Sequence, residues 1–337
     1  MKDIINSRIL FLEEPYNLKF KTFKLDIKNL ESQKVLCKTV YTAISPGSET
    51  AHYQGLRALI GKNKYPRTLG YCNLAKVMNV GSSVKSYKKN DYILTFEPHK
   101  SHFLIDEDEI IAKVPKKINL KEAVCAYLFH LGYNSLHKTK IKYGSRVVVL
   151  GLGALGVGAI NVFKNAGAEV YAITENTLTK KIAKKIGVEG CYKRSQATNL
   201  IKKLGSNLVD VVIITTSSWK DWQLALDLCG LNSIIGVLGF PGRNQKLSTI
   251  NPLQSKNFYI KQLSIVSLGL SPTKNDDRNF LRFNEKTNIE FILKEIAAKR
   301  IVTKNIITGI FPASQIEKAY KNIISHKSDA ITYVLKW

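Results

Sequence analysis

The chain has 337 residues, 45% hydrophobic and 23% charged, proportions that are typical of a globular protein with buried cores and exclude a disordered or fibrous class. Its formal charge of +25 suggests a nucleic-acid partner. However, 42 of the 51 basic residues are lysines spread over the whole length, whereas proteins that recognise specific phosphates or bases favour arginine. No apolar run approaches the ~20 residues of a membrane-spanning helix, so composition argues against a dedicated nucleic-acid or membrane function.

The N-terminal segment alternates charged and apolar residues and lacks both the continuous apolar region and the small-residue cleavage site of a secretory signal. We therefore expect a cytoplasmic protein. The five cysteines are widely separated and form no C-x-x-C pair, which argues against a disulfide framework and against a structural zinc ribbon. We expect reduced, buried thiols.

Short apolar segments broken by turns fill the chain up to about residue 119. Examples are RILFLEE, VLCKTVYTAI, NLAKVMNV and DYILTF, separated by Gly, Pro and Asn. Alternation with period two and this punctuation predict a mostly β domain.

From residue 121 the pattern changes to helical stretches that alternate with fully apolar strands. Residues 121–140 have helical spacing, and apolar strands follow at RVVVL, AEVYAIT, VDVVIITT, SIIGVL and QLSIVSL. This alternation predicts an α/β domain with a doubly wound parallel sheet covered by helices on both faces. After Pro272 we expect two more helices, NIEFILKEIAAKR and ASQIEKAYKNIIS, and a last strand, AITYVLKW.

A glycine-rich turn, G-L-G-A-L-G, follows the strand RVVVL and precedes a helix and a second strand. In this context Gly151 would allow a tight turn, Gly153 the close approach of a pyrophosphate, and Gly156 the packing of helix on strand. Ala154 and Leu155 would supply backbone N–H groups at a helix N-terminus, which favours an anion. The turn therefore predicts a dinucleotide-binding site.

The end of the second strand indicates which dinucleotide binds, because an acidic residue there binds the ribose 2′-OH and repels a 2′-phosphate. Thr174 is expected at this tip, followed by Glu175, with Lys180 and Lys181 shortly after. A hydroxyl and lysines favour NADP(H) as the cofactor. Glu175 could instead turn inward and select NAD(H), and both lysines could simply be the solvated face of a helix, so NAD stays open.

The order of segments resembles that of the medium-chain dehydrogenase/reductase superfamily, over the full length of the chain. The segments AGAEVYAIT and KKIAKKIGVEG, which follow the glycine turn, strengthen the resemblance. It implies a GroES-like β-barrel catalytic domain with an inserted Rossmann domain. We expect the catalytic domain at residues 1–120, the Rossmann domain at 121–271, and a return segment at 272–337 that completes the catalytic domain.

Many members of this superfamily hold a catalytic zinc through a Cys in a G-[IV]-C-G-[ST]-D turn, a His in G-H-E, and a third Cys or acidic residue. In this chain the matching positions carry Ser45, Tyr71 and, counted back from G-Y-x-S, Tyr127. A hydroxyl and two phenols are poor zinc ligands. We therefore predict no metal at this site.

The S-P-G-S-E turn, the E-P-H-K-S-H segment and the late Q-L-S-I-V-S-L run resemble one zinc-less branch, which includes a dehydrogenase of a hydroxyethyl bacteriochlorophyllide. The resemblance implies hydride transfer between a nicotinamide and a small-molecule carbonyl, alcohol or enone. Two alternatives stay open: an enoyl or quinone reductase that needs no proton donor, and a nucleotide-binding sensor or RNA-binding protein without turnover. The oligomeric state is also open, with a homodimer as one option.

Without a metal, an alkoxide formed from a carbonyl needs a proton donor. Tyr71, Tyr127 and Ser45 are expected to face the vacated metal site, and His130, three residues after Tyr127, could share that face. We rank Tyr71 first as donor, then His130, then Tyr127. For each, a cleft-wall or buried structural role is the competing interpretation.

Other candidates carry weaker signals. Phe96 matches a position that lines the substrate pocket in the superfamily, and His99 is a candidate wall residue in the P-H-K-S-H loop, for which a structural role competes. Thr215, Thr216 and Gly239 follow apolar strands, where ligands bind parallel sheets. Glu49 and Ser48 are expected to hold the S-P-G-S-E turn rather than to relay a proton.

Overall fold

The computed structural model describes residues 3–56, 63–243, 245–246, 248–325 and 329–337. The chain divides into two compact units: unit 1 comprises Met1–Tyr127 and Ile289–Trp337, and unit 2 comprises Leu128–Asn288. The predicted domain boundaries at residues 120 and 271 differ from these divisions, because the helices Ala126–Thr139 and Glu285–Ala297 each run through a division.

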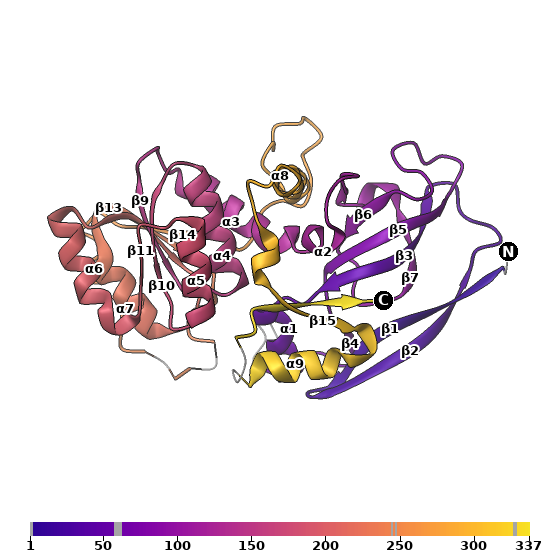
Figure 1. Ribbon diagram of the computed structural model, residues 1–337, viewed down its shortest axis with the longest axis horizontal. Helices are drawn as coiled ribbons and strands as arrows, with labels where there is room; N and C mark the ends of the chain where they lie inside the picture. Colours follow the sequence, from indigo (N-terminus) through magenta and orange to yellow (C-terminus); the bar gives the residue numbers. More distant parts are fainter. Residues whose placement is uncertain (1–2, 57–62, 244, 247, 326–328) are drawn as a thin grey trace. The chain divides into compact units, whose positions relative to one another are not determined.

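Unit 1 is mostly β-structure, arranged in two sheets (Figure 1). The smaller sheet has the order β2-β1-β4, with bounds Asn17–Asp26, Ile4–Glu14 and Arg67–Thr68. The larger follows the order β15-β16-β3-β5-β6-β8, and β7 pairs with β3. The bounds are β3 (Lys34–Ala43), β5 (Cys72–Val80), β6 (Tyr92–Thr95), β7 (His102–Asp106), β8 (Ala112–Lys113), β15 (Ile307–Pro312) and β16 (Thr332–Lys336). Since β16 pairs with β3, the C-terminal segment completes the sheet of the N-terminal segment.

Alternating burial along β1 supplies one core of unit 1. Leu10 and Leu12 point inward from this strand and pack with Tyr53 and Tyr320. These tyrosines come from helices α1 (Pro46–Tyr53) and α9 (Ile316–Ile324), and their ring centroids are 5.3 Å apart. The predicted S-P-G-S-E turn is therefore the start of a helix, with Pro46 in its first turn, where a missing N–H costs nothing.

Unit 2 is built on one parallel sheet with strand order β11-β10-β9-β12-β13-β14. The strands are β9 (Arg146–Leu150), β10 (Glu169–Ile173), β11 (Gly190–Tyr192), β12 (Val209–Ile214), β13 (Cys229–Val237) and β14 (Ser264–Ser267). Val147 to Leu150 are fully buried, as expected for a strand covered on both faces. The predicted doubly wound α/β fold is confirmed.

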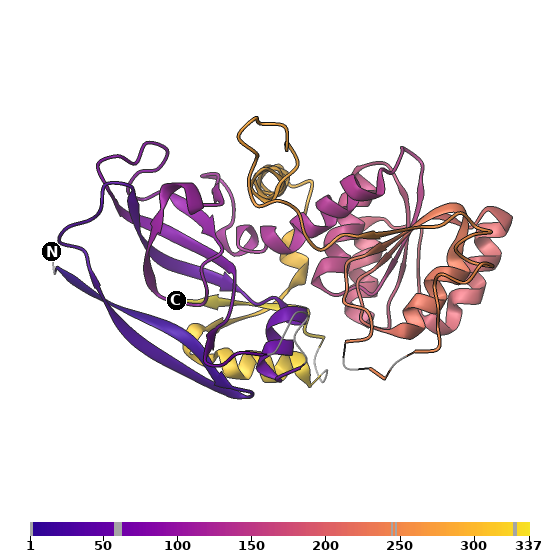
Figure 2. The same ribbon diagram turned by 180° about the vertical axis from the view of Figure 1, so that it is seen from behind.

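Helices cover both faces of this sheet. Figures 1 and 2 show α3, α4 and α5 on one face and α6 and α7 on the other. Their bounds are α3 (Ala126–Thr139), α4 (Ala154–Asn165), α5 (Thr177–Ile186), α6 (Ala197–Leu204) and α7 (Trp219–Leu228). The remaining helices are α2 (Leu120–Ala123) and α8 (Glu285–Ala297), and short 3₁₀ turns fill several connections.

Some elements differ from the prediction. The helix expected over residues 121–140 is interrupted between α2 and α3, because the chain turns at the buried residues Val124 and Cys125. Strands β11 and β15 were not predicted, since their half-buried residues form no continuous apolar run.

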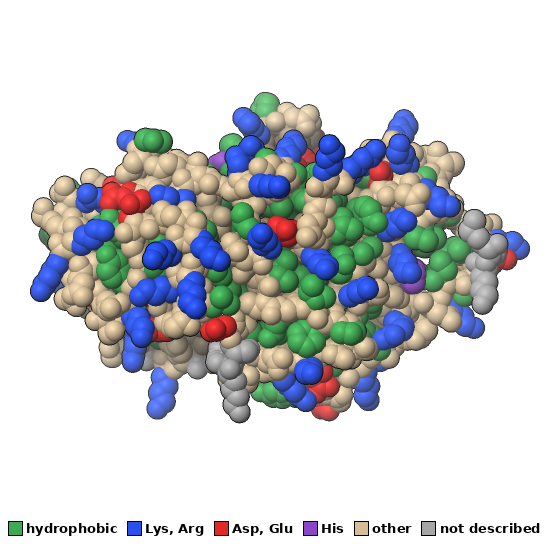
Figure 3. All heavy atoms as spheres, viewed as in Figure 1, with side chains coloured by type: hydrophobic (Ala, Val, Ile, Leu, Met, Phe, Trp, Pro, Cys, Tyr) green, Lys and Arg blue, Asp and Glu red, His purple; other side chains and the backbone are tan. Residues whose placement is uncertain are grey.

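The basic residues are spread over the surface, as they are along the sequence. Lysine and arginine side chains are scattered over the face seen in Figure 3 instead of gathering in one patch. Among the described residues, no helix combines the length and apolarity needed to cross a bilayer.

Candidate active site

The glycine-rich turn joins β9 to α4 in unit 2. Gly151 has a φ of +88°, in the left-handed region that favours glycine, and a Cβ on it would overlap the Thr216 side chain. A Cβ on Gly156 would overlap the Gly151 carbonyl oxygen, whereas one on Gly153 would meet nothing within 4 Å. Packing therefore requires the first and last glycines, while Gly153 leaves room for a ligand beside the backbone.

Helix α4 begins directly after this turn. Its N-cap is Gly153, no side chain caps it, and Ala154 and Leu155 are its first residues. The first N–H groups of a helix lack partners within the helix, and the helix dipole there favours negative charge. The turn and this open N-terminus fit the pyrophosphate of a dinucleotide.

Thr174, at the end of β10, is 5% exposed, and its hydroxyl already has partners. It accepts the Asn176 backbone N–H at 3.2 Å and lies 3.0 Å from the Thr179 hydroxyl. Asn176 in turn caps α5 by accepting the Thr179 backbone N–H. Thr174 therefore shapes this edge of the sheet, and its hydroxyl would have to leave these partners to bind a ligand.

The two lysines predicted to favour NADP(H) lie on α5. Lys180 and Lys181 are both exposed, four and five residues after the Asn176 cap. The structure thus places them on the solvent face of the helix that follows Thr174.

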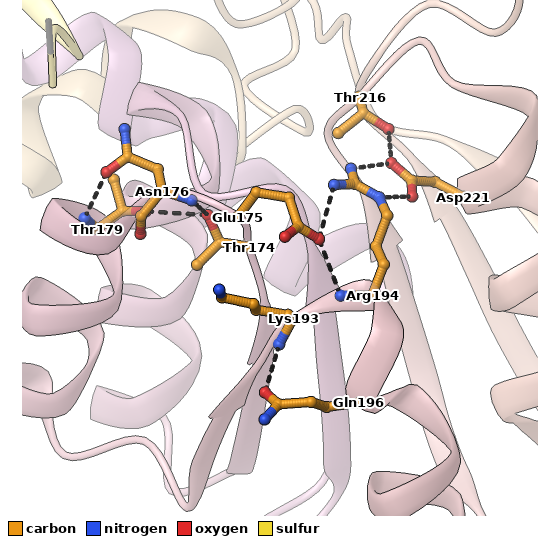
Figure 4. A network of polar contacts seen from close by, with 9 residues as sticks. All are labelled: Thr174, Glu175, Asn176, Thr179, Lys193, Arg194, Gln196, Thr216 and Asp221. Atoms are coloured by element: carbon orange, nitrogen blue, oxygen red, sulfur yellow. Dashed lines mark hydrogen bonds and ion pairs between the residues drawn. The ribbon is translucent and has the colours of Figure 1, made fainter.

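Arg194 was missed by the sequence analysis and forms the strongest charged contacts at this edge (Figure 4). Its Nε and Nη2 donate to the two carboxylate oxygens of Asp221 at 2.6 and 2.8 Å. Its backbone N–H donates to Glu175 at 2.9 Å, and the Thr216 hydroxyl donates to Asp221. Hydrogen bonding to Asp221 raises the pKa of Arg194. No motif marked Arg194 or Asp221, since the two lie 27 positions apart.

Thr215, Thr216 and Gly239 all lie at the carboxyl ends of neighbouring strands. The Thr215 hydroxyl donates to the Gly151 carbonyl at 2.7 Å. Gly239 packs against the backbone of both threonines, where a Cβ would overlap. These residues therefore support the glycine turn from the side of β12 and β13.

In unit 1, four of the predicted residues come together. The rings of Tyr71 and Tyr127 lie 5.0 Å apart, and those of Tyr127 and Phe96 lie 5.3 Å apart, both edge to face. The Tyr71 hydroxyl donates to Ser45 Oγ. A small cavity of about 10 Å³ lies among these rings, with roughly the room of one water molecule. Its lining is Tyr71, Cys72, Asn73, Leu94, Thr95, Phe96, Ile111, Val124, Tyr127 and Ile289.

Burial is the main reason that the pKa of Tyr71 is raised above its ordinary value. The phenol is therefore protonated at neutral pH, as a proton donor must be. Burial likewise raises the pKa of the neighbouring Cys72, so this thiol is protonated at neutral pH.

Glu49 and His99 form a fully buried pair beside this group, only 1% and 0% exposed. His99 Nε2 and the Tyr320 hydroxyl lie 2.7 and 2.6 Å from one Glu49 oxygen, and the Ser45 backbone N–H donates to the other at 2.7 Å. His99 Nδ1 lies 2.8 Å from the Thr42 hydroxyl. His99, predicted as a substrate-wall residue, thus lies in a buried network and is not among the residues lining the cavity above.

His130 is fully buried on α3. Its Nε2 lies 3.9 Å from a carboxylate oxygen of Glu285, at the start of α8. Burial raises the pKa of Glu285. The structure therefore pairs His130 with a carboxyl group that sequence reasoning missed, because 155 positions separate the two.

The three positions at which the resemblance implies a zinc site do not fit zinc. Ser45, Tyr71 and Tyr127 offer no thiolate, imidazole or carboxylate, the ligands that zinc prefers. Over the described ranges, no group of three or more His, Cys, Asp or Glu side chains is arranged to hold a metal ion.

Comparison with known proteins gives one family and a set of dehydrogenases. Residues 154–285 match the family of zinc-binding dehydrogenases. The chain is 22% identical over 216 residues to the 2-dehydro-3-deoxy-L-galactonate 5-dehydrogenase of Pseudoalteromonas atlantica, covering 63% of this chain and 57% of that protein. It is 21% identical over 315 residues to the sorbitol dehydrogenase of Bacillus subtilis, covering 80% and 88%.

Solved structures share the fold over nearly the whole chain. The L-idonate 5-dehydrogenase of Escherichia coli superposes with a TM-score of 0.81 at 14% identity, covering 99% of both chains. A short chain alcohol dehydrogenase from E. coli CFT073 in complex with NADH has a TM-score of 0.79 at 16% identity, over 98% and 99%. A zinc-binding dehydrogenase from Sinorhizobium meliloti bound to NADP has a TM-score of 0.79 at 15% identity, over 99% and 100%.

These matches agree with the glycine turn of unit 2 and with the β-rich fold of unit 1. Residues 154–285 are thus similar to zinc-binding dehydrogenases, the fold is shared with the solved dehydrogenases, and the named relatives support an oxidoreductase enzyme.

Proposed function

We propose that the chain is a metal-independent oxidoreductase that transfers hydride between a nicotinamide cofactor and a small carbonyl, alcohol or enone, with NADP(H) favoured over NAD(H). The observation that carries this proposal is the open N-terminus of α4 behind Gly151 and Gly153. It supports a bound pyrophosphate, which in turn supports a nicotinamide cofactor. Such a cofactor, when bound, supplies or accepts the hydride.

The residues of unit 1 suit the proton step. When a carbonyl is reduced, Tyr71 gives its hydroxyl proton to the new alkoxide oxygen and becomes a phenolate. Ser45, which now accepts the Tyr71 hydrogen bond, can turn its own hydroxyl to donate to that phenolate. The phenol is a stronger acid than a simple alcohol even with its pKa raised, so the transfer runs toward the alkoxide.

The named relatives make polyhydroxylated substrates the first to test. Sorbitol, L-idonate and 2-dehydro-3-deoxy-L-galactonate are the compounds in their names. Turnover should be measured with these and with a simple ketone and an enone, using both NADPH and NADH. Reduction of the enone that survives combined replacement of Tyr71, Tyr127 and His130 would favour the reductase that needs no donor.

Metal independence rests on Ser45, Tyr71 and Tyr127 at the three ligand positions. Elemental analysis of protein purified without chelator should find well under one zinc per chain, and activity should survive a chelator. A full equivalent of zinc, with activity lost on chelation, would overturn this part of the proposal.

Cofactor preference is measured by fluorescence or calorimetric titration. NADPH should bind more tightly than NADH, and combined Lys180→Ala and Lys181→Ala should reduce that preference. Tighter binding of NADH by the parent protein would contradict the NADP(H) part of the proposal and leave the dehydrogenase assignment standing.

A further inference from the structure

The Asp221 carboxylate holds Arg194 from the inside of unit 2 (Figure 4). Asp221 is 1% exposed, and both of its oxygens accept from the Arg194 guanidinium, at 2.6 and 2.8 Å. The Thr216 hydroxyl donates to the same carboxylate, and Thr216 packs against Gly151 of the glycine turn. Arg194 is thereby fixed to the dinucleotide edge of the sheet, and little entropy remains for it to lose when a ligand binds.

Glu175 contacts Arg194 on its solvent-exposed side, and this ion pair is much weaker than the buried pair with Asp221. Its carboxylate accepts the Arg194 backbone N–H at 2.9 Å and lies 3.5 Å from Nη1, and its side chain is 52% exposed. Half-exposed ion pairs contribute little to stability, because water screens the two charges. The outward-facing donors of Arg194 are thus occupied by an anion that is easily displaced.

The Arg194 backbone N–H and Nη1 lie near the end of β10, where a Rossmann sheet binds the adenosine ribose of a dinucleotide. In a Rossmann sheet the ribose 2′ position lies at the end of the second strand, which here is β10, followed by Thr174 and Glu175. The Thr174 hydroxyl already has partners in Asn176 and Thr179. Arg194 and the exposed Lys193 beside it add positive charge to that of Lys180 and Lys181 on α5.

We propose that Arg194 recognises the 2′-phosphate of NADP(H) by exchange: the phosphate replaces the Glu175 carboxylate on the backbone N–H and Nη1 of Arg194, while Asp221 keeps the guanidinium in place. This inference rests on the proposed nicotinamide function. Phosphate carries more charge than a carboxylate and forms strong charge-assisted bonds with arginine, so the exchange favours the phosphate. NADH has no phosphate to exchange.

Glu175 therefore competes with NADP(H). Replacing it by glutamine removes the competing charge and keeps the size of the side chain. Glu175→Gln should tighten NADPH binding about 3- to 5-fold, the upper range for loss of one competing exposed ion pair, while NADH binding changes by less than about twofold.

Arg194 attracts the 2′-phosphate of NADPH, so its removal should weaken NADPH binding. Arg194→Gln alone would leave the buried Asp221 carboxylate without its cation and could unfold the chain. The combined Arg194→Gln and Asp221→Asn variant removes both charges. It should weaken NADPH binding about 10- to 100-fold, the equivalent of one charge-assisted hydrogen bond, with NADH affinity nearly unchanged.

The experiment is calorimetric titration of the full chain with NADPH and NADH, and with 2′,5′-ADP and 5′-AMP, which differ only in the phosphate. Matched controls are Glu189→Gln, which removes a carboxylate 43% exposed elsewhere on unit 2, and Lys185→Gln, which removes an exposed cation from α5. Neither control should change the ratio of NADPH to NADH affinity by more than about twofold, because screening weakens distant charges.

The outcomes separate this inference from the proposed function. If the parent binds neither NADPH nor NADH, the proposed function fails and the exchange fails with it. If both bind, but Glu175→Gln does not raise the affinity ratio and the double variant does not lower it, Arg194 is not the phosphate site and the dehydrogenase function stands. A loss of NADH affinity in Glu175→Gln with unchanged NADPH affinity would instead assign Glu175 to the 2′-OH and overturn the exchange.

Discussion

Helix α4 in unit 2 begins at Gly153 without a side-chain cap, whereas helix α1 in unit 1 begins behind Ser45, whose backbone N–H donates to Glu49 at 2.7 Å. Both helices leave N–H groups at their starts, where negative charge is favourable. The chain supplies that charge itself at α1, with a carboxylate that is 1% exposed. At α4 it supplies none, so a ligand can.

This difference separates groups that hold the fold from groups that face a ligand. Glu49 and His99 satisfy each other inside unit 1, while Gly153 faces open space in unit 2. Changes to the first kind should reduce stability, and changes to the second kind should reduce binding or turnover with stability unchanged. Tyr71 lines the small cavity of unit 1, so the proposed proton step places it, with its hydrogen-bond partner Ser45, in the second kind.

The largest effect is expected for Tyr71→Phe. Loss of the proton donor should lower kcat on a ketone by about 10²- to 10⁴-fold, the usual contribution of a general acid. Cofactor affinity should stay near that of the parent, and the free energy of unfolding should fall by only about 1 kcal/mol, because one oxygen is removed and Ser45 Oγ loses one hydrogen bond. Steady-state kinetics with a parallel cofactor titration measure both. An unchanged kcat would remove Tyr71 from the proton step and make His130 the next donor to test.

Glu49→Ala should have the largest effect on stability. It leaves the Ser45 N–H, His99 and Tyr320 without their shared acceptor, and breaking a buried pair of this kind costs about 3–5 kcal/mol. Urea unfolding measures the change. Glu317→Ala, at a carboxylate 47% exposed on α9, is the control and should cost less than about 1 kcal/mol. If both variants lose equally little, the network does not stabilise unit 1.

Two glycines of the turn in unit 2 test the distinction between residues that stabilise the fold and residues that contact a ligand. Gly151→Ala forces an alanine to a φ of +88° and against Thr216, which should cost about 1–3 kcal/mol of stability. Gly153→Ala meets no neighbour and has a φ of −77°, so stability should change by less than about 0.5 kcal/mol.

NADPH affinity should nevertheless fall in both variants. In Gly153→Ala the new Cβ would lie where the pyrophosphate must approach, and Gly151→Ala strains the turn that would hold the pyrophosphate. Calorimetry with NADPH, alongside urea unfolding, separates the two effects. Undiminished affinity in Gly153→Ala would mean that the pyrophosphate does not lie on this turn.

The sequence predicted the fold of unit 2 well because its signals are local. Four consecutive apolar residues before a glycine turn indicate a buried parallel strand, and the helix and strand that follow lie within about 20 residues. Short elements such as β11, with only three half-buried residues, give no such signal. Helix α1 was read as a turn since proline and glycine occupy its first positions.

The contacts of the candidate sites could be predicted only in part. Ser45, Tyr71 and Tyr127 were grouped through the resemblance, and the ring and hydroxyl contacts among them agree with that grouping. The contacts from Glu49 to His99 and Tyr320 span 50 and 271 positions, and no local pattern encodes partners so far apart. Arg194 was missed for the same reason.

The smallest effect is expected at Glu285, a second buried carboxyl group, which lies beside His130 and the Thr273 side chain. Burial raises its pKa, so the folded state favours the protonated carboxyl. The stability that this group contributes is fully present below its unfolded pKa and is lost as the pH rises through the raised folded pKa. The free energy of unfolding of the parent, minus that of Glu285→Gln, should therefore fall as the pH rises from acid toward neutral.

Urea unfolding of both chains at several pH values measures this difference. His130 Nε2, 3.9 Å from the Glu285 carboxylate, is the group that can reverse the sign. A protonated imidazole would favour the ionised carboxylate, so the parent would gain stability relative to Glu285→Gln as Glu285 ionises. A rising difference would thus identify a buried ion pair, and it should vanish in His130→Gln. A falling difference would instead leave Glu285 and His130 as two groups that share a buried space without sharing a charge.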